Sequence, residues 1–111
     1  MRIYHNPRCS KSRQALALCQ ERGVDLEIVE YLKEKPTKKA LEAILSGLGG
    51  DLKQMTRAAD LRKAGLEPTI ELLTERPEFL QRPILVDGKS VSVARSPEAV
   101  AEFLDGQNRG K

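Results

Sequence analysis

Near its start the chain reads Ile3-Tyr4-His5-Asn6-Pro7-Arg8-Cys9-Ser10-Lys11-Ser12-Arg13, and the rest of the chain is organised around this stretch. A short apolar run ends at Tyr4, a proline-containing turn follows, and a helix is predicted to open around Ser10. Cys9 therefore stands where backbone N–H groups lack an intrahelical partner and the helix dipole favours negative charge. The same geometry binds oxyanions and lowers the pKa of a cysteine. We interpret Cys9 as a thiolate nucleophile beside an anion-binding loop.

Two other roles for Cys9 are weighed against this interpretation. A free cysteine is often a small buried hydrophobe, but the neighbours here include Arg8, Lys11 and Arg13, which favour a reactive thiol. A metal site would have to use His5, Cys9 and Cys19 with carboxylates, and the His5–Cys9 spacing is not one that zinc sites use. We therefore expect neither a bound metal nor a bound cofactor.

Composition indicates a soluble globular protein of one domain spanning residues 1–111, with 40% hydrophobic and 32% charged residues. The net charge of +3 is small, and two Phe and two Tyr offer few rings for stacking on bases, so we expect no nucleic-acid partner. We see no apolar leader and no segment that could span a bilayer, so no membrane contact is expected. Two cysteines without an export signal favour the reducing cytoplasm.

The N-terminal part predicts a β-α-β unit. Arg2 to Tyr4 is expected to form a strand, and a helix is expected from about Ser10 to Arg22, where Gly23 ends it. The segment from Leu26 to Tyr31 alternates apolar and polar residues as a strand does. Such a unit normally closes right-handed with its two strands parallel.

The rest of the chain predicts a helical insertion over about residues 37–80, followed by a β-β-α unit. The insertion begins at Pro36-Thr37 and includes a short turn after Asp51, a short helix over 60–66 and a helix from Thr69 to Arg76. Asp87-Gly88 predicts a hairpin between two apolar runs, and Ser96-Pro97 begins the last helix. Residues 105–111 are expected to form a flexible polar tail. The fold class is therefore α/β, with a four-stranded mixed sheet.

The motif from His5 to Arg13 resembles the signature of the glutaredoxin-coupled arsenate reductase (ArsC) family, which has a thioredoxin-like fold. Three arginines fall where that family places its own, and the similarity covers about residues 2–104. They are Arg57 after Met55-Thr56, Arg82 in Gln81-Arg82-Pro83-Ile84 and Arg95 in Arg95-Ser96-Pro97-Glu98. The segment between Arg57 and Arg82 is shorter than in the longer members, which alters one wall of the site.

The resemblance implies a reaction and roles for these residues. Cys9 attacks arsenate to form a thiol-arsenate adduct, and Arg57, Arg82 and Arg95 hold the oxyanion. Glutathione then enters, glutaredoxin completes the reduction, and arsenite leaves. His5 is expected to help lower the pKa of Cys9, and the peptide bond before Pro83 is expected to be cis.

The first turn of the helix supplies three more candidates. Ser12 stands where a dithiol redox protein has its resolving cysteine, and its hydroxyl could donate a hydrogen bond to the Cys9 thiolate, although a plain helix serine is the alternative. Ser10 and Lys11 are the remaining candidates for contact with the substrate. For Lys11 the alternative is a solvent-facing ammonium.

Cys19 is not expected to resolve Cys9. Ten helical residues separate the two positions by roughly 15 Å, whereas a disulfide requires Cα atoms within about 7 Å. Cys19 lies on the apolar face of the helix and is expected in the core. The thiol that resolves Cys9 should therefore come from another molecule, and glutathione and glutaredoxin are the expected partners of a monomeric protein.

Two other functions remain open. The first is a glutathione-linked thiol oxidoreductase whose substrate is not arsenate. The second is a Spx-like regulator that binds RNA polymerase, a group that typically carries Cys-x-x-Cys as a redox switch. Ser12 in place of the second cysteine, together with the three arginines, favours chemistry on an oxyanion such as arsenate.

Overall fold

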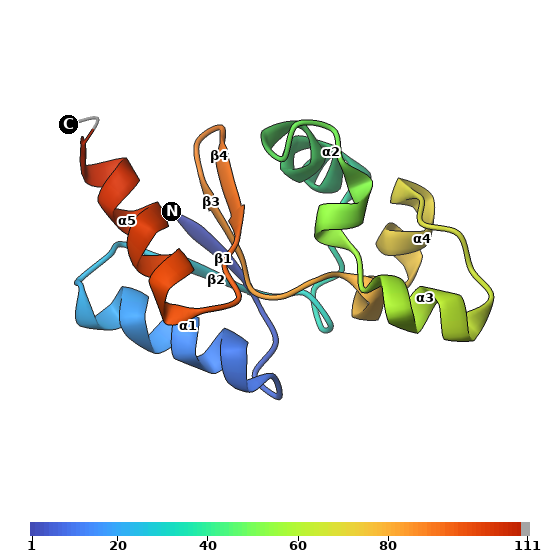
Figure 1. The fold of residues 1–111 in the computed structure, drawn as a ribbon, viewed down its shortest axis with the longest axis horizontal. Coiled ribbons are helices and arrows are strands. Elements are labelled where there is room, and N and C mark those ends of the chain that lie inside the picture. The colour runs from blue at the N-terminus through green and yellow to red at the C-terminus, as the bar shows by residue number, and fades with distance from the viewer. Residues whose placement is uncertain (110–111) are drawn as a thin grey trace.

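The computed structural model describes residues 1–109, and its elements follow one another in the predicted order (Figure 1). The N-terminal unit comprises β1 (Arg2–His5), α1 (Ser10–Glu21) and β2 (Glu27–Glu30). The insertion comprises α2 (Lys38–Gly47), the 3-10 turn η1 (Leu52–Met55), α3 (Ala58–Ala64), α4 (Ile70–Glu75) and the 3-10 turn η2 (Pro77–Phe79). The C-terminal unit comprises β3 (Ile84–Asp87), β4 (Ser90–Val93) and α5 (Pro97–Arg109).

The four strands form one mixed sheet in the order β2-β1-β3-β4, which confirms the predicted fold class. β1 runs parallel to β2 and antiparallel to β3, and β3 pairs antiparallel with β4. β1 is therefore an interior strand, and its last residue, His5, pairs with Glu30 of β2. Because β2 lies on one side of β1 and β3 on the other, the loop that leaves β1 emerges where ligands typically bind in open α/β sheets.

Side chains that alternate along the strands divide the interior into two hydrophobic clusters. Ile3 of β1 and Leu85 of β3 pack in one cluster, together with residues of α1 and α5 such as Cys19 and Val100. Tyr4 and Ile84 belong to the other cluster, which they share with the helical insertion. Figure 1 shows the corresponding arrangement, with α1 and α5 on one side of the sheet and α2, α3 and α4 on the other.

The predicted helix starts are confirmed where a side chain caps them. The Thr37 hydroxyl accepts a hydrogen bond from the Ala40 amide at 3.1 Å, and the Thr69 hydroxyl accepts one from the Leu72 amide at 3.0 Å. The Ser96 hydroxyl likewise accepts from the Ala99 amide at 3.1 Å, one residue before the helix begins at Pro97.

The structure differs from the prediction at several helix boundaries, and α3 ends at Ala64, two residues before the predicted Leu66. α3 begins at Ala58 rather than at Asp60, because the Arg57 amide donates to the Phe79 carbonyl at 2.8 Å and places the helix start directly after Arg57. Pro77, which was expected only to end a helix, also opens η2.

Part of the predicted flexible tail is helical in the structure, while its flexibility stays a prediction. Residues 105–109 continue α5, and the Arg22 guanidinium of the α1 C-cap contacts the Asp105 carboxylate at 2.6 Å, which ties this part of α5 to α1. Residues 110 and 111 of that predicted tail lie outside the described part of the chain.

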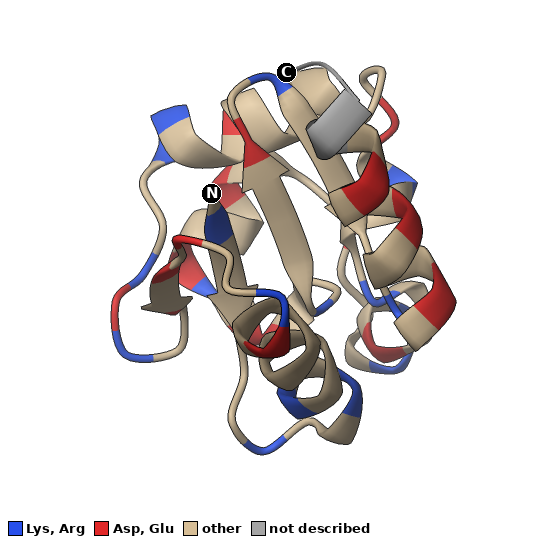
Figure 2. Ribbon diagram, turned by 90° about the vertical axis from the view of Figure 1, so that its left-hand side faces the viewer, with Lys and Arg blue, Asp and Glu red and all other residues tan. Residues whose placement is uncertain are grey.

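The surface carries charges of both signs. Figure 2 shows Lys and Arg positions interspersed with Asp and Glu positions along the ribbon in that view, rather than one face of a single sign. Over residues 1–109, every helix is either too short or too polar to cross a lipid bilayer.

Candidate active site

Cys9 ends the loop that leaves β1 and is the N-cap residue of α1. Its amide donates to the Asn6 carbonyl at 3.0 Å, and the Asn6 side-chain oxygen accepts from the Arg8 amide at 3.0 Å. The Arg13 guanidinium closes the loop from the helix side by donating to the Pro7 carbonyl at 2.9 Å. These contacts hold the Cys9 side chain at the start of the helix, as predicted from the sequence.

The Cys9 thiol is half-buried, and its pKa is lowered from the ordinary value. Burial by itself raises the pKa, but the amide N–H groups of Ser12 and Lys11 and the Arg82 guanidinium oppose it and prevail. The sulfur accepts no hydrogen bond of ideal capping geometry, so the stabilisation comes from several weak donors together. A thiolate at this position is both exposed enough to react and stabilised enough to form.

Ser12 is fully buried, and its hydroxyl is engaged away from the sulfur. The oxygen accepts a hydrogen bond from the Asn6 amide at 3.0 Å and lies 2.6 Å from Nδ1 of His5. Between these described residues the predicted bond from the Ser12 hydroxyl to Cys9 is not formed, and the backbone N–H of Ser12 faces the thiol instead. Ser12 therefore joins β1, the loop and α1.

His5 lies buried at the end of β1 and is a neutral imidazole at neutral pH. Burial lowers the pKa of His5, the Glu30 carboxylate opposes this effect, and Arg13 adds to it. A neutral ring contributes no positive charge to the thiolate. Any influence of His5 on Cys9 is therefore indirect, through the Ser12 hydroxyl and the loop that it supports.

A pH-dependent stability follows from the lowered pKa of His5. The unfolded chain binds a proton at His5 more readily than the folded chain does, so protonation of His5 favours unfolding. The contribution of neutral His5 to the free energy of unfolding is therefore complete above the unfolded pKa, about 6.5, and is lost as the pH falls. We expect the free energy of unfolding in urea to fall between pH 7.5 and pH 5.5 more steeply for the wild type than for His5→Gln. Equal slopes would contradict a buried neutral imidazole.

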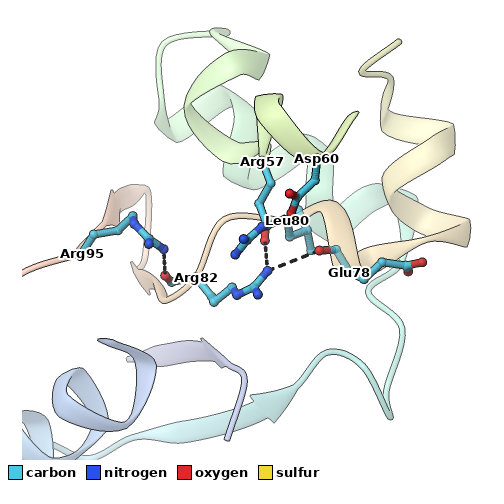
Figure 3. A network of polar contacts seen from close by, with 6 residues as sticks. All are labelled: Arg57, Asp60, Glu78, Leu80, Arg82 and Arg95. Atoms are coloured by element: carbon cyan, nitrogen blue, oxygen red, sulfur yellow. Dashed lines mark hydrogen bonds and ion pairs between the residues drawn. The ribbon is translucent and has the colours of Figure 1, made fainter. Parts of the chain in front are cut away.

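Arg82 lies between η2 and β3, and it connects the thiol to the rest of the site. Its Nη1 donates to the carbonyl groups of Glu78 and Leu80, both at 3.3 Å, and its own carbonyl accepts a bond of 2.6 Å from Nη1 of Arg95 (Figure 3). The bond between Arg82 and Pro83 is cis, as the sequence resemblance predicts. Nε of Arg82 is buried and has no hydrogen-bond partner within residues 1–109.

Arg57 and Arg95 line an open pocket of about 150 Å³, together with Asp60, Gln81 and the neighbouring alanines 58 and 59. Figure 3 shows Arg57 and Arg95 on opposite sides of Arg82, with the Arg57 guanidinium close to that of Arg82. Cys9 and Arg82 do not line the pocket, so the site has two parts: the thiol with Arg82, and the pocket with Arg57 and Arg95. The three arginines predicted from separate segments are thus brought together.

Asp60 is a residue of the site that the sequence analysis missed. Its carboxylate forms an ion pair with Nε of Arg57 on the pocket wall, and the Arg57 guanidinium lowers the pKa of Asp60. A signal for this pair was present, since residues three apart on a helix are neighbours. Among the predicted contacts, Ser10 and the Lys11 side chain are solvent-exposed, and only the Lys11 amide approaches the thiol.

Cys19 lies in the core with no exposed surface, and burial raises its pKa, as expected for an inert thiol. Within residues 1–109 no three His, Cys, Asp or Glu side chains gather closely enough to hold a metal ion. The arrangement therefore combines a half-exposed thiol next to Arg82 with an open pocket lined by Arg57, Arg95 and Asp60.

Comparison with known proteins identifies the family. The ArsC family model matches residues 4–103. The arsenate reductase of Haemophilus influenzae is 36% identical, covering 92% of this chain and 97% of that protein, and one from Neisseria meningitidis is 35% identical, covering 94% and 97%. The structure of an arsenate reductase from Vibrio cholerae superposes with a TM-score of 0.78 at 30% identity, covering 93% of this chain and 98% of the other. On these matches, the chain belongs to the ArsC family.

Proposed function

We propose that this protein reduces arsenate to arsenite through a covalent intermediate on Cys9, with glutathione and glutaredoxin as reductants. The observation that carries the proposal is a half-exposed thiol of lowered pKa beside Arg82, next to a pocket lined by Arg57 and Arg95. Guanidinium groups bind tetrahedral oxyanions through paired donors. The relatives named as arsenate reductases support arsenate as the oxyanion.

The first step is nucleophilic attack of the Cys9 thiolate on arsenic. A bond forms between sulfur and arsenic, and the bond from arsenic to one hydroxyl group breaks. The leaving hydroxide takes a proton from solvent and departs as water, so that arsenic remains in its +5 state. In this proposal Arg82 holds the anion next to the sulfur, and its positive charge also favours the thiolate form of Cys9.

The reduction needs two electrons, which two thiols supply when they are oxidised to one disulfide. One of the two is the Cys9 thiol. Because Cys19 is sealed in the core and the hydroxyl of Ser12 cannot form a disulfide, the second thiol, and the thiol that later regenerates Cys9, must come from other molecules. In the proposed sequence glutathione attacks the adduct, arsenite leaves, and glutaredoxin resolves the mixed disulfide between Cys9 and glutathione. A monomer in the cytoplasm, where glutathione is reduced, fits this chemistry.

A coupled assay tests the proposal. We expect NADPH oxidation that depends on arsenate when the protein is mixed with glutathione, glutaredoxin and glutathione reductase. Absence of arsenate-dependent turnover with glutathione and also with thioredoxin would contradict it and would favour a thiol oxidoreductase with another substrate. Stable capture of RNA polymerase subunits by the protein would favour the regulator instead.

A further inference from the structure

Tyr31 carries a buried hydroxyl that no group in the described part of the chain contacts by a hydrogen bond. The residue has no exposed surface, and within residues 1–109 its hydroxyl has no hydrogen-bond partner. A buried hydroxyl without a partner is costly and rare, and it calls for a specific explanation. Phenylalanine would fill the same space without that cost.

The sheet register explains why this hydroxyl lies at the active site. β1 and β2 are parallel, and their last paired residues are His5 and Glu30. Asn6 and Tyr31 are the next residues on the two strands, so Tyr31 leaves the sheet beside the loop that carries Cys9. The groups whose charges and dipoles act on the Tyr31 hydroxyl are Arg82, Asn6, Cys9 and Arg57, which are residues of the site and its loop.

The hydroxyl keeps its proton and can therefore donate a hydrogen bond. Burial raises the pKa of Tyr31, although Arg82 and Asn6 oppose this effect, so the group keeps its proton at neutral pH. The Asn6 side chain lies nearby but outside hydrogen-bond geometry, and its oxygen already accepts from the Arg8 amide. Nε of Arg82 is a second buried donor that has no partner in the described part of the chain, and its guanidinium also acts on Cys9.

We propose that the Tyr31 hydroxyl donates a hydrogen bond to an oxygen of arsenate held at Cys9, and that it has no partner until this anion arrives. The inference rests on the proposed function. The hydroxyl is closed to solvent, so the anion oxygen reaches it after a shift of the half-buried Cys9 and Arg82 side chains. In the free protein this unpaired donor costs free energy. Binding of the anion removes that cost and thereby increases the affinity for the anion.

Tyr31→Phe removes only the hydroxyl and tests the proposal by binding, without turnover. Arsenate should protect Cys9 of the wild type from alkylation by iodoacetamide, with the label assigned to Cys9 by mass spectrometry. We expect Tyr31→Phe to need a roughly tenfold higher arsenate concentration for half-protection. Its urea midpoint should equal or exceed that of the wild type, and the pH profile of alkylation without arsenate should not change.

Tyr4→Phe is the matched control. Tyr4 is also a buried tyrosine, but its hydroxyl accepts a hydrogen bond of 3.4 Å from Arg2 rather than facing a residue of the active site. The arsenate concentration that half-protects Cys9 from alkylation should be the same in Tyr4→Phe as in the wild type. The proposal is overturned if Tyr31→Phe is protected as well as the wild type, if it lowers the urea midpoint, if it raises the pKa of Cys9 in the free protein, or if arsenate does not protect the wild type. Protection of the wild type without turnover in the coupled assay would reject the proposed function while leaving this comparison valid.

Discussion

Cys9→Ser is expected to reduce arsenate-dependent turnover by at least about a thousandfold in the coupled assay. The serine hydroxyl keeps the size of the side chain but is not ionised at neutral pH, so no nucleophile remains to attack arsenic. The variant should fold as the wild type does, because Cys9 is half-exposed and caps α1 without a side-chain hydrogen bond of ideal geometry. The measurement is arsenate-dependent NADPH oxidation, with far-ultraviolet circular dichroism to establish folding.

Cys19→Ser is the matched control for this experiment, since it makes the same chemical change ten positions along the same helix. A hydroxyl in the core without a partner should cost about 1–3 kcal/mol of stability. Below its unfolding transition the variant should keep the turnover of the wild type. Loss of turnover in a folded Cys19→Ser protein would mean that the buried thiol takes part in the reaction, contrary to its complete burial.

Arg82→Ala is expected to lower kcat/KM for arsenate by about a hundredfold, the typical effect of removing one donor to a developing anion. It should also raise the pKa of Cys9, because the guanidinium is one of the groups that lower it. The pH dependence of alkylation by iodoacetamide measures that pKa directly. An unchanged alkylation profile would contradict the contact between Arg82 and the thiol.

Two further variants separate charge from geometry at this position. Arg82→Lys keeps the positive charge but loses the planar fork, so the pKa of Cys9 should stay lowered more than in Arg82→Ala, while arsenate binding remains weakened. Arg62→Ala removes an exposed guanidinium of α3 and should change neither quantity. A deficit in Arg62→Ala as large as that in Arg82→Ala would indicate a general effect of net charge.

The order of elements was predictable because local signals and burial pattern agree along most of the chain. Thr37, Thr69 and Ser96 are side chains that cap helices in a recognisable position. The hairpin signalled by Asp87-Gly88 is formed, with its turn at Gly88 and Lys89. The boundaries that differ depend on contacts between distant segments. The start of α3 follows from the bond between Arg57 and Phe79, and a pattern within one segment contains no information about it.

The candidate site was predictable in its residues more than in its contacts. Cys9 could be placed from the helix start alone, and the three arginines from the resemblance, but the partners of each side chain could not. The neutral state of His5 depends on its burial by the folded chain, and the Ser12 hydroxyl turns to His5 and Asn6 because both converge on it in space. Tyr31 drew no attention in the sequence because an aromatic residue at a strand end is ordinary.

The ion pair on the pocket wall bears on selectivity. Because the Asp60 carboxylate already occupies Nε of Arg57, an incoming anion replaces an internal partner instead of meeting a bare cation. The free energy gained at Arg57 is then the attraction between Arg57 and the anion minus the attraction between Arg57 and Asp60. This difference is small for a weakly charged anion and larger for a more highly charged one. If arsenate binds here as proposed, competition from Asp60 should make this wall favour doubly charged oxyanions over carboxylates.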